Sequence, residues 1–175
     1  MKIKNVAFIG LGVMGYPMAG FLQKNNYNVT VYNRSDSKSL LWIKEHNGNI
    51  ASTSGEAAKN SDVVFICVGK DEDLKNVMEG SQGILENSNK NTIIVDHTTA
   101  SAEIAREYYT KAKKLNLAFL DAPVSGGQAG AEKGILSIMV GGDKADFDIV
   151  EPVLRSYGKT IELIGNAGSG QLSKM

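Results

Sequence analysis

Three glycines near the start of the chain have the spacing that lets a backbone approach a phosphate group. Gly10, Gly12 and Gly15 form a G-x-G-x-x-G pattern directly after the apolar run 6–9. In such a pattern the first glycine allows a tight turn, the second allows close approach of a pyrophosphate, and the third allows a helix to pack closely on a strand. The amide groups at the start of that helix then face the phosphate anions. The sequence therefore predicts that a dinucleotide binds along Gly10, Leu11, Gly12, Val13, Met14 and Gly15.

The residues after the next apolar run bear on the choice of dinucleotide. Asn33, Arg34 and Ser35 stand where NAD-binding proteins usually carry an acid that bonds to the ribose. Without that acid nothing repels a 2′-phosphate, and Arg34 can pair with it through two hydrogen bonds while Ser35 donates its hydroxyl. The sequence therefore favours NADP as the cofactor, and the nearby Asp36 keeps NAD as an alternative.

The elements that position these residues are short apolar strands alternating with helical patterns. Five runs lack strict polar alternation, which is typical of strands covered on both faces of a parallel sheet: residues 6–9, 29–32, 63–66, 92–95 and 117–120. Apolar residues at helical spacing predict a crossover helix after the glycine pattern and another over residues 101–115, with Ser101 as its N-cap. This alternation predicts a Rossmann-type α/β fold, a doubly wound and mostly parallel sheet with helices on both faces.

The pattern changes after residue 130. We expect a strand over 135–140, a turn at Gly141-Gly142, a helix over 145–157 and a last strand over 160–164. These two strands are expected to run against the others at one edge of the sheet. The glycine-rich segment 165–170 is typical of a hinge.

Glycines and polar residues gather where the predicted strands end. Gly10, Asn33, Gly69, Asp96 and Asp121 each follow a different apolar run. Open α/β sheets bind ligands beyond the carboxyl ends of their strands. The sequence therefore predicts a ligand crevice at this edge.

Composition and charge restrict the classes of partner. Among 175 residues, 19 Lys+Arg balance 19 Asp+Glu, so no net charge holds the chain on nucleic acid or on an anionic membrane. A single cysteine allows neither an internal disulfide nor a thiolate zinc site, and no metal site is predicted. No apolar stretch approaches the roughly 18 residues of a membrane span. We expect a cytoplasmic protein that binds neither nucleic acid nor membrane.

Two other chemical patterns fail on specific residues. The segment 165–170 has the spacing of a P-loop, but Gln171 stands in place of the phosphate-binding lysine. Ser125 lacks the flanking glycine of a hydrolase nucleophile elbow. A nucleotide hydrolase and an esterase are therefore disfavoured.

His97 and Cys67 carry no catalytic signal of their own. His97 follows Asp96 directly, and adjacent residues of a strand point to opposite faces, so the two side chains do not form a catalytic pair. We expect His97 to have a capping or structural role. Cys67 is expected to pack on a core strand.

Three further segments carry motifs in a fixed order. Residues 96–99 read DHTT, residues 121–127 read DAPVSGG and residues 168–174 read GSGQLSK. Together with residues 10–19, they resemble the β-hydroxyacid dehydrogenase family, of which 3-hydroxyisobutyrate dehydrogenase is a representative. In the segment beside the nicotinamide, His97 and Thr98 depart from the family's commoner Cys or Ser. The resemblance covers the whole chain.

The resemblance implies an oxidoreductase that transfers a hydride between NADP and a short β-hydroxy acid or its semialdehyde, of the 3-hydroxyisobutyrate type. Lys174 stands at the place of the family's catalytic lysine, which would exchange a proton with the substrate hydroxyl. The carboxylate of this small-molecule partner would be held by Ser125, Gly126 and Gly127. The resemblance adds to the cofactor contacts Val68, Gly69 and Thr98.

Members of the family continue into an all-helical domain. The resemblance therefore implies a dinucleotide-binding domain over residues 1–165 and, over 166–175, the start of a linker helix to a helical domain that is missing here. It implies that the isolated chain binds cofactor but is inactive, because Lys174 lies near the end of a fraying helix and its side chain has no fixed direction. The full-length protein is expected to be a homo-oligomer.

Two other functions stay open at this point. A non-catalytic dinucleotide-binding scaffold or sensor would need the same glycines but would have no use for Ser125 together with Lys174. A phosphogluconate dehydrogenase-type enzyme would need extra cations for a substrate phosphate, and that branch usually has His at the position of Gln171.

Overall fold

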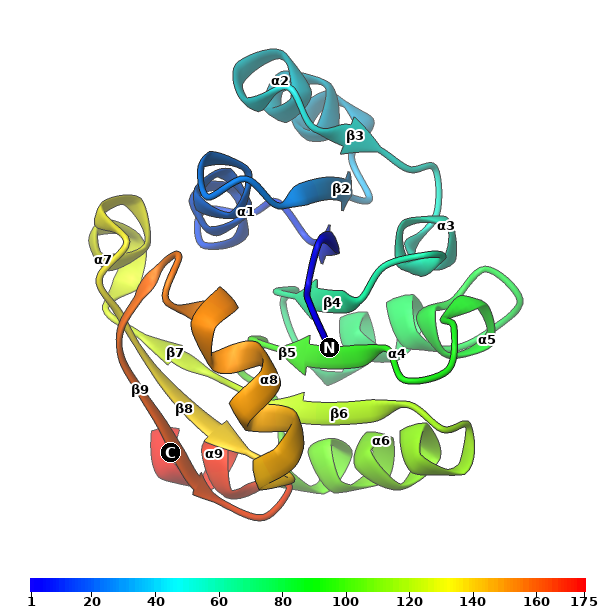
Figure 1. The fold of residues 1–175 in the computed structure, drawn as a ribbon, viewed down its shortest axis with the longest axis vertical. Helices are drawn as coiled ribbons and strands as arrows, with labels where there is room; N and C mark the ends of the chain where they lie inside the picture. The colour runs from blue at the N-terminus through cyan, green and yellow to red at the C-terminus, as the bar shows by residue number, and fades with distance from the viewer.

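The protein is built on one mostly parallel sheet. The computed structural model describes residues 1–175. Its strands are, in chain order, β1 (Asn5–Ile9), β2 (Asn28–Tyr32), β3 (Asn49–Ile50), β4 (Val63–Ile66), β5 (Ile93–Asp96), β6 (Ala118–Asp121), β7 (Val124–Ser125), β8 (Leu136–Gly141) and β9 (Gly158–Gly165). Across the sheet they are ordered β3-β2-β1-β4-β5-β6-β8-β7, with β9 paired to β8 (Figure 1). The chain therefore starts inside the sheet and winds outward in both directions, as a doubly wound fold does.

Helices cover both faces of this sheet. They are α1 (Gly15–Lys24), α2 (Asp36–His46), α3 (Ser54–Ala58), α4 (Asp71–Met78), α5 (Ile84–Asn87), α6 (Ala102–Lys114), α7 (Gly127–Lys133), α8 (Lys144–Leu154) and α9 (Ser169–Lys174). Buried residues of α1, α2 and α8 belong to one apolar cluster, and those of α3 to α6 belong to a second. The sheet separates two cores, which confirms the predicted fold class.

Strand β1 shows why an unbroken apolar run forms a central strand. Val6 and Phe8 belong to the first cluster, whereas Ala7 and Ile9 belong to the second, and all four are fully buried. Because successive side chains point to opposite faces, a strand covered on both sides is apolar throughout. The same division holds along β4.

Two strands begin and end one residue later than the sequence predicts. β5 ends at Asp96 and β6 ends at Asp121, so both acids are the last residues of strands and not the first residues after them. At the edge of the sheet β8 runs antiparallel to β6, and β9 runs parallel to β8. The last two long strands therefore run against the others, as expected.

The glycine-rich segment 165–170 is not a hinge, contrary to the expectation from its sequence. Gly168 has a φ of 91°, and a Cβ there would lie 2.9 Å from Nε of Arg106. At Gly170 a Cβ would lie 2.5 Å from the carbonyl oxygen of Met139. These glycines are required because α9 lies directly on β8 and α6, so the segment is a tightly packed turn.

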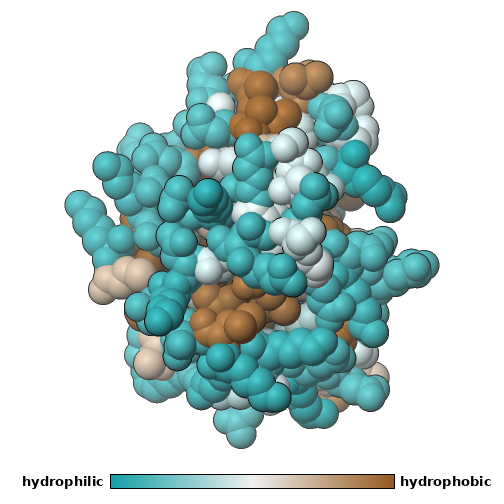
Figure 2. All heavy atoms as spheres, turned by 90° about the vertical axis from the view of Figure 1, so that its right-hand side faces the viewer, coloured by the Kyte–Doolittle hydropathy of each residue, from teal (hydrophilic) through white to brown (hydrophobic).

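The surface carries no element suited to crossing a membrane. No helix has the length and apolar character needed to span a bilayer. On the face drawn in Figure 2, apolar residues gather in small patches within a mainly hydrophilic surface. The upper patch lies at the level of α2 and β3, where Leu40, Leu41 and Ile50 are exposed. Patches of this kind are ordinary on a folded protein.

Candidate cofactor and substrate site

The turn between β1 and α1 needs two of its glycines for its own packing. Gly10 has a φ of 100°, and a Cβ there would lie 2.2 Å from the carbonyl oxygen of Cys67. A Cβ at Gly15 would lie 2.0 Å from the carbonyl oxygen of Gly10. Both distances are far shorter than a Cβ and a carbonyl oxygen can approach. The first and third glycines of the pattern therefore serve the fold.

The middle glycine differs, because the protein itself leaves its space open. A Cβ at Gly12 would meet no atom within 4 Å, and its φ is not in the left-handed region. The backbone N–H groups of Gly12, Val13 and Met14 have no acceptor within the protein. Amides that point into open space at a helix start are suited to phosphate oxygens. The residues present thus fit a pyrophosphate group.

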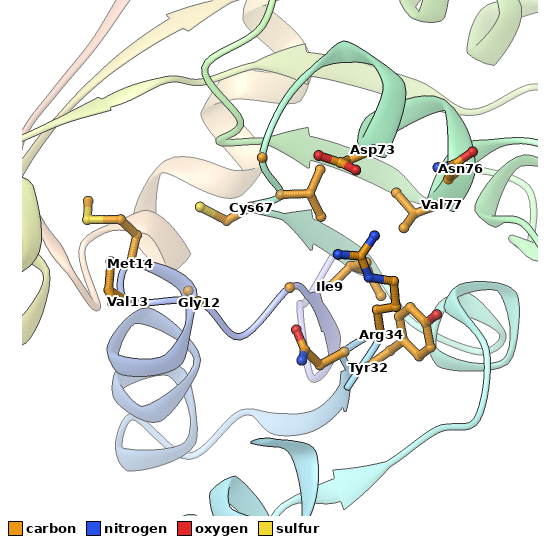
Figure 3. A pocket seen from close by; sticks show the side chains of 15 residues that line it. Ile9, Gly12, Val13, Met14, Tyr32, Arg34, Cys67, Asp73, Asn76 and Val77 are labelled. Atoms are coloured by element: carbon orange, nitrogen blue, oxygen red, sulfur yellow. The ribbon is translucent and has the colours of Figure 1, made fainter. Parts of the chain in front are cut away.

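This turn borders a cavity at the carboxyl ends of β1, β2 and β4, with a volume of about 460 Å³. It is lined by Ile9, Gly10, Gly12, Val13, Met14, Gly15, Tyr32, Asn33, Arg34, Cys67, Val68, Gly69, Asp73, Asn76 and Val77. Figure 3 shows the guanidinium of Arg34 extending toward the wall formed by Asp73 and Val77. The structure therefore brings the predicted glycines, Asn33, Arg34, Val68 and Gly69 around one space.

Three residues predicted to contact the cofactor lie outside this lining. Leu11 is fully buried in the core, and its N–H donates to Oδ1 of Asn33 at 2.8 Å. The hydroxyl of Ser35 lies 2.9 Å from that of Ser37. The Thr98 hydroxyl accepts from the N–H of Val68 at 3.1 Å. Leu11 and Thr98 therefore do not line the cavity themselves but bond to Asn33 and Val68, which do.

Asn33 lines the cavity, but its side chain is occupied. Besides accepting from Leu11, the amide donates through Nδ2 to the carbonyl oxygen of Ser35 at 3.1 Å. It thereby ties the glycine turn to the end of β2. Its side chain fixes the position of the turn, while the guanidinium of Arg34 is free of any ion pair.

Sequence reasoning missed one wall of the cavity. Asp73, Asn76 and Val77 on α4 line it, and their i, i+3, i+4 spacing marks one helical face. That spacing, after the third apolar run, is a signal that could have identified them. Cys67 was expected on a core strand, but it follows the end of β4 and lines the cavity. Burial, with the nearby Asp96, raises the pKa of its thiol to about 12, so it is not a reactive thiolate.

The predicted catalytic lysine lies beside the predicted substrate segment. Nζ of Lys174 on α9 donates to the carbonyl oxygen of Val124 at 2.6 Å, and Ser125 is the next residue of β7. The side chain of Lys174 therefore has a defined direction, contrary to the expectation of a frayed, undirected terminus. Gly126 and Gly127 follow with φ of 134° and 62°, and a Cβ at Gly127 would meet nothing within 4 Å. Open space thus adjoins the segment next to the lysine.

Asp121 holds α9 in this place. Its carboxylate is fully buried and accepts from the N–H groups of Gly168 at 2.8 Å and Gln171 at 3.0 Å. Burial raises the pKa of this carboxyl, and the bonds from the amides act in the opposite direction. The acid at the end of β6 therefore caps a helix, and neither of its oxygens faces the cavity at β1.

His97 is structural, as the sequence predicts. Nδ1 lies 2.6 Å from the carbonyl oxygen of Ala122, and Nε2 lies 2.7 Å from the hydroxyl of Tyr157. Burial lowers the pKa of the imidazole to about 4. The ring is therefore neutral near pH 7, donating from Nδ1 and accepting at Nε2. It ties the end of β5 to the turn before Ser125.

Asp96 is a buried acid with one unused oxygen. Oδ1 accepts from the N–H of Thr98 at 3.0 Å, whereas Oδ2 is buried without a partner. Burial raises the pKa of this carboxyl to about 7, and the nearby Asp121 and Asp71 add to the effect. The pKa of Asp96 is higher in the folded protein than in the unfolded chain. The protonated carboxyl therefore contributes its full stabilisation below about pH 4, and this stabilisation is lost as the pH rises through about 7.

We expect the Asp96→Asn variant to lack this pH dependence. Relative to the variant, the unaltered protein should lose unfolding free energy on the order of 4 kcal/mol between about pH 4 and about pH 8, since each pKa unit corresponds to about 1.4 kcal/mol. Urea unfolding of both proteins across this range measures the difference. The exposed Asp36→Asn variant is the control. If the unfolding free energies of Asp96→Asn and the unaltered protein change in parallel with pH, burial of the Asp96 carboxylate does not destabilise the protein and the prediction is wrong.

Comparisons with known proteins agree with this geometry. Residues 5–165 match the NAD binding domain of 6-phosphogluconate dehydrogenase. An uncharacterized oxidoreductase of Shewanella frigidimarina is 55% identical over 170 residues, which are 97% of this chain and 58% of that protein. The solved 3-hydroxyisobutyrate dehydrogenase of Mycobacterium tuberculosis is similar with a TM-score of 0.92 and 31% identity, covering 99% of this chain and 58% of that one. Psf3, solved in complex with NADP+ and 2-OPP, gives a TM-score of 0.92 at 28% identity, covering 97% of this chain and 60% of the other.

These matches run along the whole of the present fold, from β1 to the glycine-rich turn before α9. The chain spans somewhat less than two thirds of the length of the relatives that it matches. The chain belongs to the family of oxidoreductases that includes 6-phosphogluconate and 3-hydroxyisobutyrate dehydrogenases, and it comprises an NAD-binding domain of that family.

Proposed function

We propose that this chain is the cofactor domain of an NADP-dependent enzyme that interconverts a short β-hydroxy acid and its semialdehyde. The observation that carries the proposal is the contact of Lys174 Nζ with the Val124 carbonyl, which brings the lysine to Ser125. A scaffold that only binds nucleotide has no need for this arrangement. The relative from Mycobacterium tuberculosis, named a 3-hydroxyisobutyrate dehydrogenase, supports the substrate class.

The cavity at β1, β2 and β4 would hold the dinucleotide. The free amides of Gly12, Val13 and Met14 would bind its pyrophosphate, and Arg34 its 2′-phosphate. When bound, the nicotinamide accepts or supplies the hydride. Val68 and Gly69 line the wall that leads away from the glycine turn, and Thr98 fixes that wall through its bond to Val68.

The segment at β7 would orient the substrate. The Ser125 hydroxyl is exposed, and the glycines at 126 and 127 leave the backbone open to a carboxylate. Lys174 would take the proton of the substrate hydroxyl in oxidation and return it in reduction. The carbonyl of Val124 keeps Nζ beside the serine until substrate is present. Orientation by these groups is the protein's share of the chemistry.

The relation to a longer protein is part of the proposal. We propose that residues 1–165 are the dinucleotide-binding domain and that α9 is the first part of a helix leading to a further, helical domain. Support comes from the length of the relatives, of which the chain spans 58% in the Shewanella frigidimarina protein. The segment beyond residue 165 nevertheless packs on β8 and α6, so it contributes to the present fold as well.

We expect NADPH to bind more tightly than NADH, and Arg34 to be the reason. A hydrogen-bonded charge pair contributes about 1.5–3 kcal/mol, so Arg34→Ala should weaken NADPH binding roughly ten- to a hundredfold. NADH binding should hardly change, because NADH lacks the 2′-phosphate. Calorimetric titration of both proteins with both nucleotides measures this. An equal loss of affinity for NADPH and NADH would show that Arg34 does not bind the 2′-phosphate.

A further inference from the structure

Gln171 is a buried residue of α9 to which the sequence assigns no role in the site. The residue is 1% exposed. Its Nε2 donates to the carbonyl oxygen of Thr98 at 2.7 Å, and its Oε1 accepts from the N–H of Ala100 at 3.2 Å. Both ends of the amide are therefore bonded inside the protein. The side chain joins α9 to the loop that follows β5.

Helix α9 is too short to keep its own direction. It runs only from Ser169 to Lys174, and helices of this length depend on tertiary contacts. The carboxylate of Asp121 accepts from the N–H groups of Gly168 and Gln171, which fixes the start of the helix against β6. The bonds of Gln171 to the Thr98–Ala100 loop supply the second attachment. Together with the packing of α9 on β8 and α6, these two attachments define the rotation of the helix about its axis.

The rotation of α9 decides where the lysine points. Lys174 follows Gln171 by three residues, a spacing at which side chains share one helical face. Nζ of Lys174 is bonded to the Val124 carbonyl, on the strand of Ser125. A turn of the helix that released Gln171 would carry Nζ away from this strand. The two side chains are therefore coupled by geometry.

We propose that Gln171 is a positioning residue for Lys174. Its amide fixes the rotation of α9, so that the lysine stays beside Ser125 and keeps a set relation to the loop at Thr98. The inference rests on the proposed function, in which Lys174 exchanges the substrate proton. Gln171 acts through the helix, because its own polar atoms are bonded to Thr98 and Ala100.

The reactivity of Lys174 tests this without requiring turnover. Methionine has a similar length to glutamine but makes neither hydrogen bond, so Gln171→Met should free Nζ from Val124. We expect reductive methylation with formaldehyde and a borane, followed residue by residue with mass spectrometry, to become about tenfold faster at Lys174. Lys144, exposed on α8, should keep its rate. A merely destabilised protein would instead react faster at all lysines.

The matched control is Gln23→Met. Gln23 is a half-buried glutamine on α1, and like that of Gln171 its Oε1 accepts a backbone N–H, that of Val29 at 3.3 Å. This variant should leave the rate at Lys174 unchanged. An unchanged rate at Lys174 in Gln171→Met, or an equal rise in Gln23→Met, would overturn the proposal.

Two further measurements cover the case in which Gln171→Met does not fold and separate this inference from the proposed function. If Gln171→Met does not fold, hydrogen exchange in the unaltered protein replaces it: the amides of Ala100 and Gln171 should open together, and protection differing by more than about tenfold would contradict the coupling. NADPH affinity is measured on the same samples and should be unchanged in Gln171→Met. Absence of NADPH binding in the unaltered protein would count against the proposed function, whereas the methylation rate decides the role of Gln171.

Discussion

Replacing Lys174 by Met should lower kcat/KM for NADPH oxidation with short-chain semialdehydes by about 10²–10⁴, the usual range for removal of a general acid or base. The Met side chain keeps most of the apolar stem but cannot donate to the Val124 carbonyl or to the oxygen of the substrate. NADPH affinity should stay the same, because Lys174 does not line the cavity at β1, β2 and β4. The loss should therefore appear in kcat more than in cofactor binding.

The assay is best made in a longer protein as well as in this chain. A fusion of this chain with the part of the Shewanella frigidimarina relative that lies outside the matched region provides this longer protein. The relative is 55% identical to the chain over the matched region. Lys144→Met on α8 is the control, since this lysine is exposed and pairs only with Asp148. Turnover that survives Lys174→Met, or that falls equally in Lys144→Met, would contradict the assignment of the proton transfer to Lys174.

The central strands could be predicted because their burial is local in sequence. The runs of β1, β4 and β5 are buried on both faces, so their composition distinguishes them from a strand with one solvent-exposed face, whereas Thr30 and Tyr32 of β2 are only half-buried. The short strands β3 and β7 have no such signal, because each contains only two residues. Their pairing is decided by β2 and β8, which lie elsewhere in the chain.

The glycine pattern could be predicted for a similar reason. Gly10, Gly12 and Gly15 lie close together in the chain, and at Gly10 and Gly15 the backbone leaves no room for a side chain. The sequence also assigned Gly12 a different role, close approach of a pyrophosphate, and the structure leaves open space there. A Cβ at Gly12 would meet no protein atom within 4 Å, whereas a Cβ at Gly10 would meet Cys67 and Val68, directly after β4.

The attachments of α9 could not be predicted from local patterns. Gln171 bonds to residues about 70 positions earlier, and Asp121 bonds to the helix across about 50 positions. No periodicity links such distant partners. Lys174 itself bonds to Val124, 50 positions earlier, so the expectation that its side chain has no fixed direction was wrong.

A substitution at Gly12 should separate binding of the nucleotide from folding. Gly12→Val adds a side chain where the protein has open space, so the free energy of unfolding should change by no more than about 0.5 kcal/mol. The valine would occupy the approach of the pyrophosphate to the amides of Val13 and Met14. Losing charge-assisted bonds of about 1.5–3 kcal/mol each should weaken NADPH binding at least about a hundredfold. Gly15→Ala is the contrasting variant, since its Cβ would lie 2.0 Å from a backbone oxygen and should unfold or strongly destabilise the protein.

Calorimetric titration of the unaltered chain and of folded Gly12→Val with NADPH and NADH tests the cavity most directly. We expect the unaltered chain to bind one NADPH, at least about tenfold more tightly than NADH, and Gly12→Val to bind neither measurably. Chemical denaturation of both proteins confirms that they are equally folded. Equal NADPH binding by the two proteins, or none by the unaltered chain, would contradict the assignment of this cavity as the cofactor site.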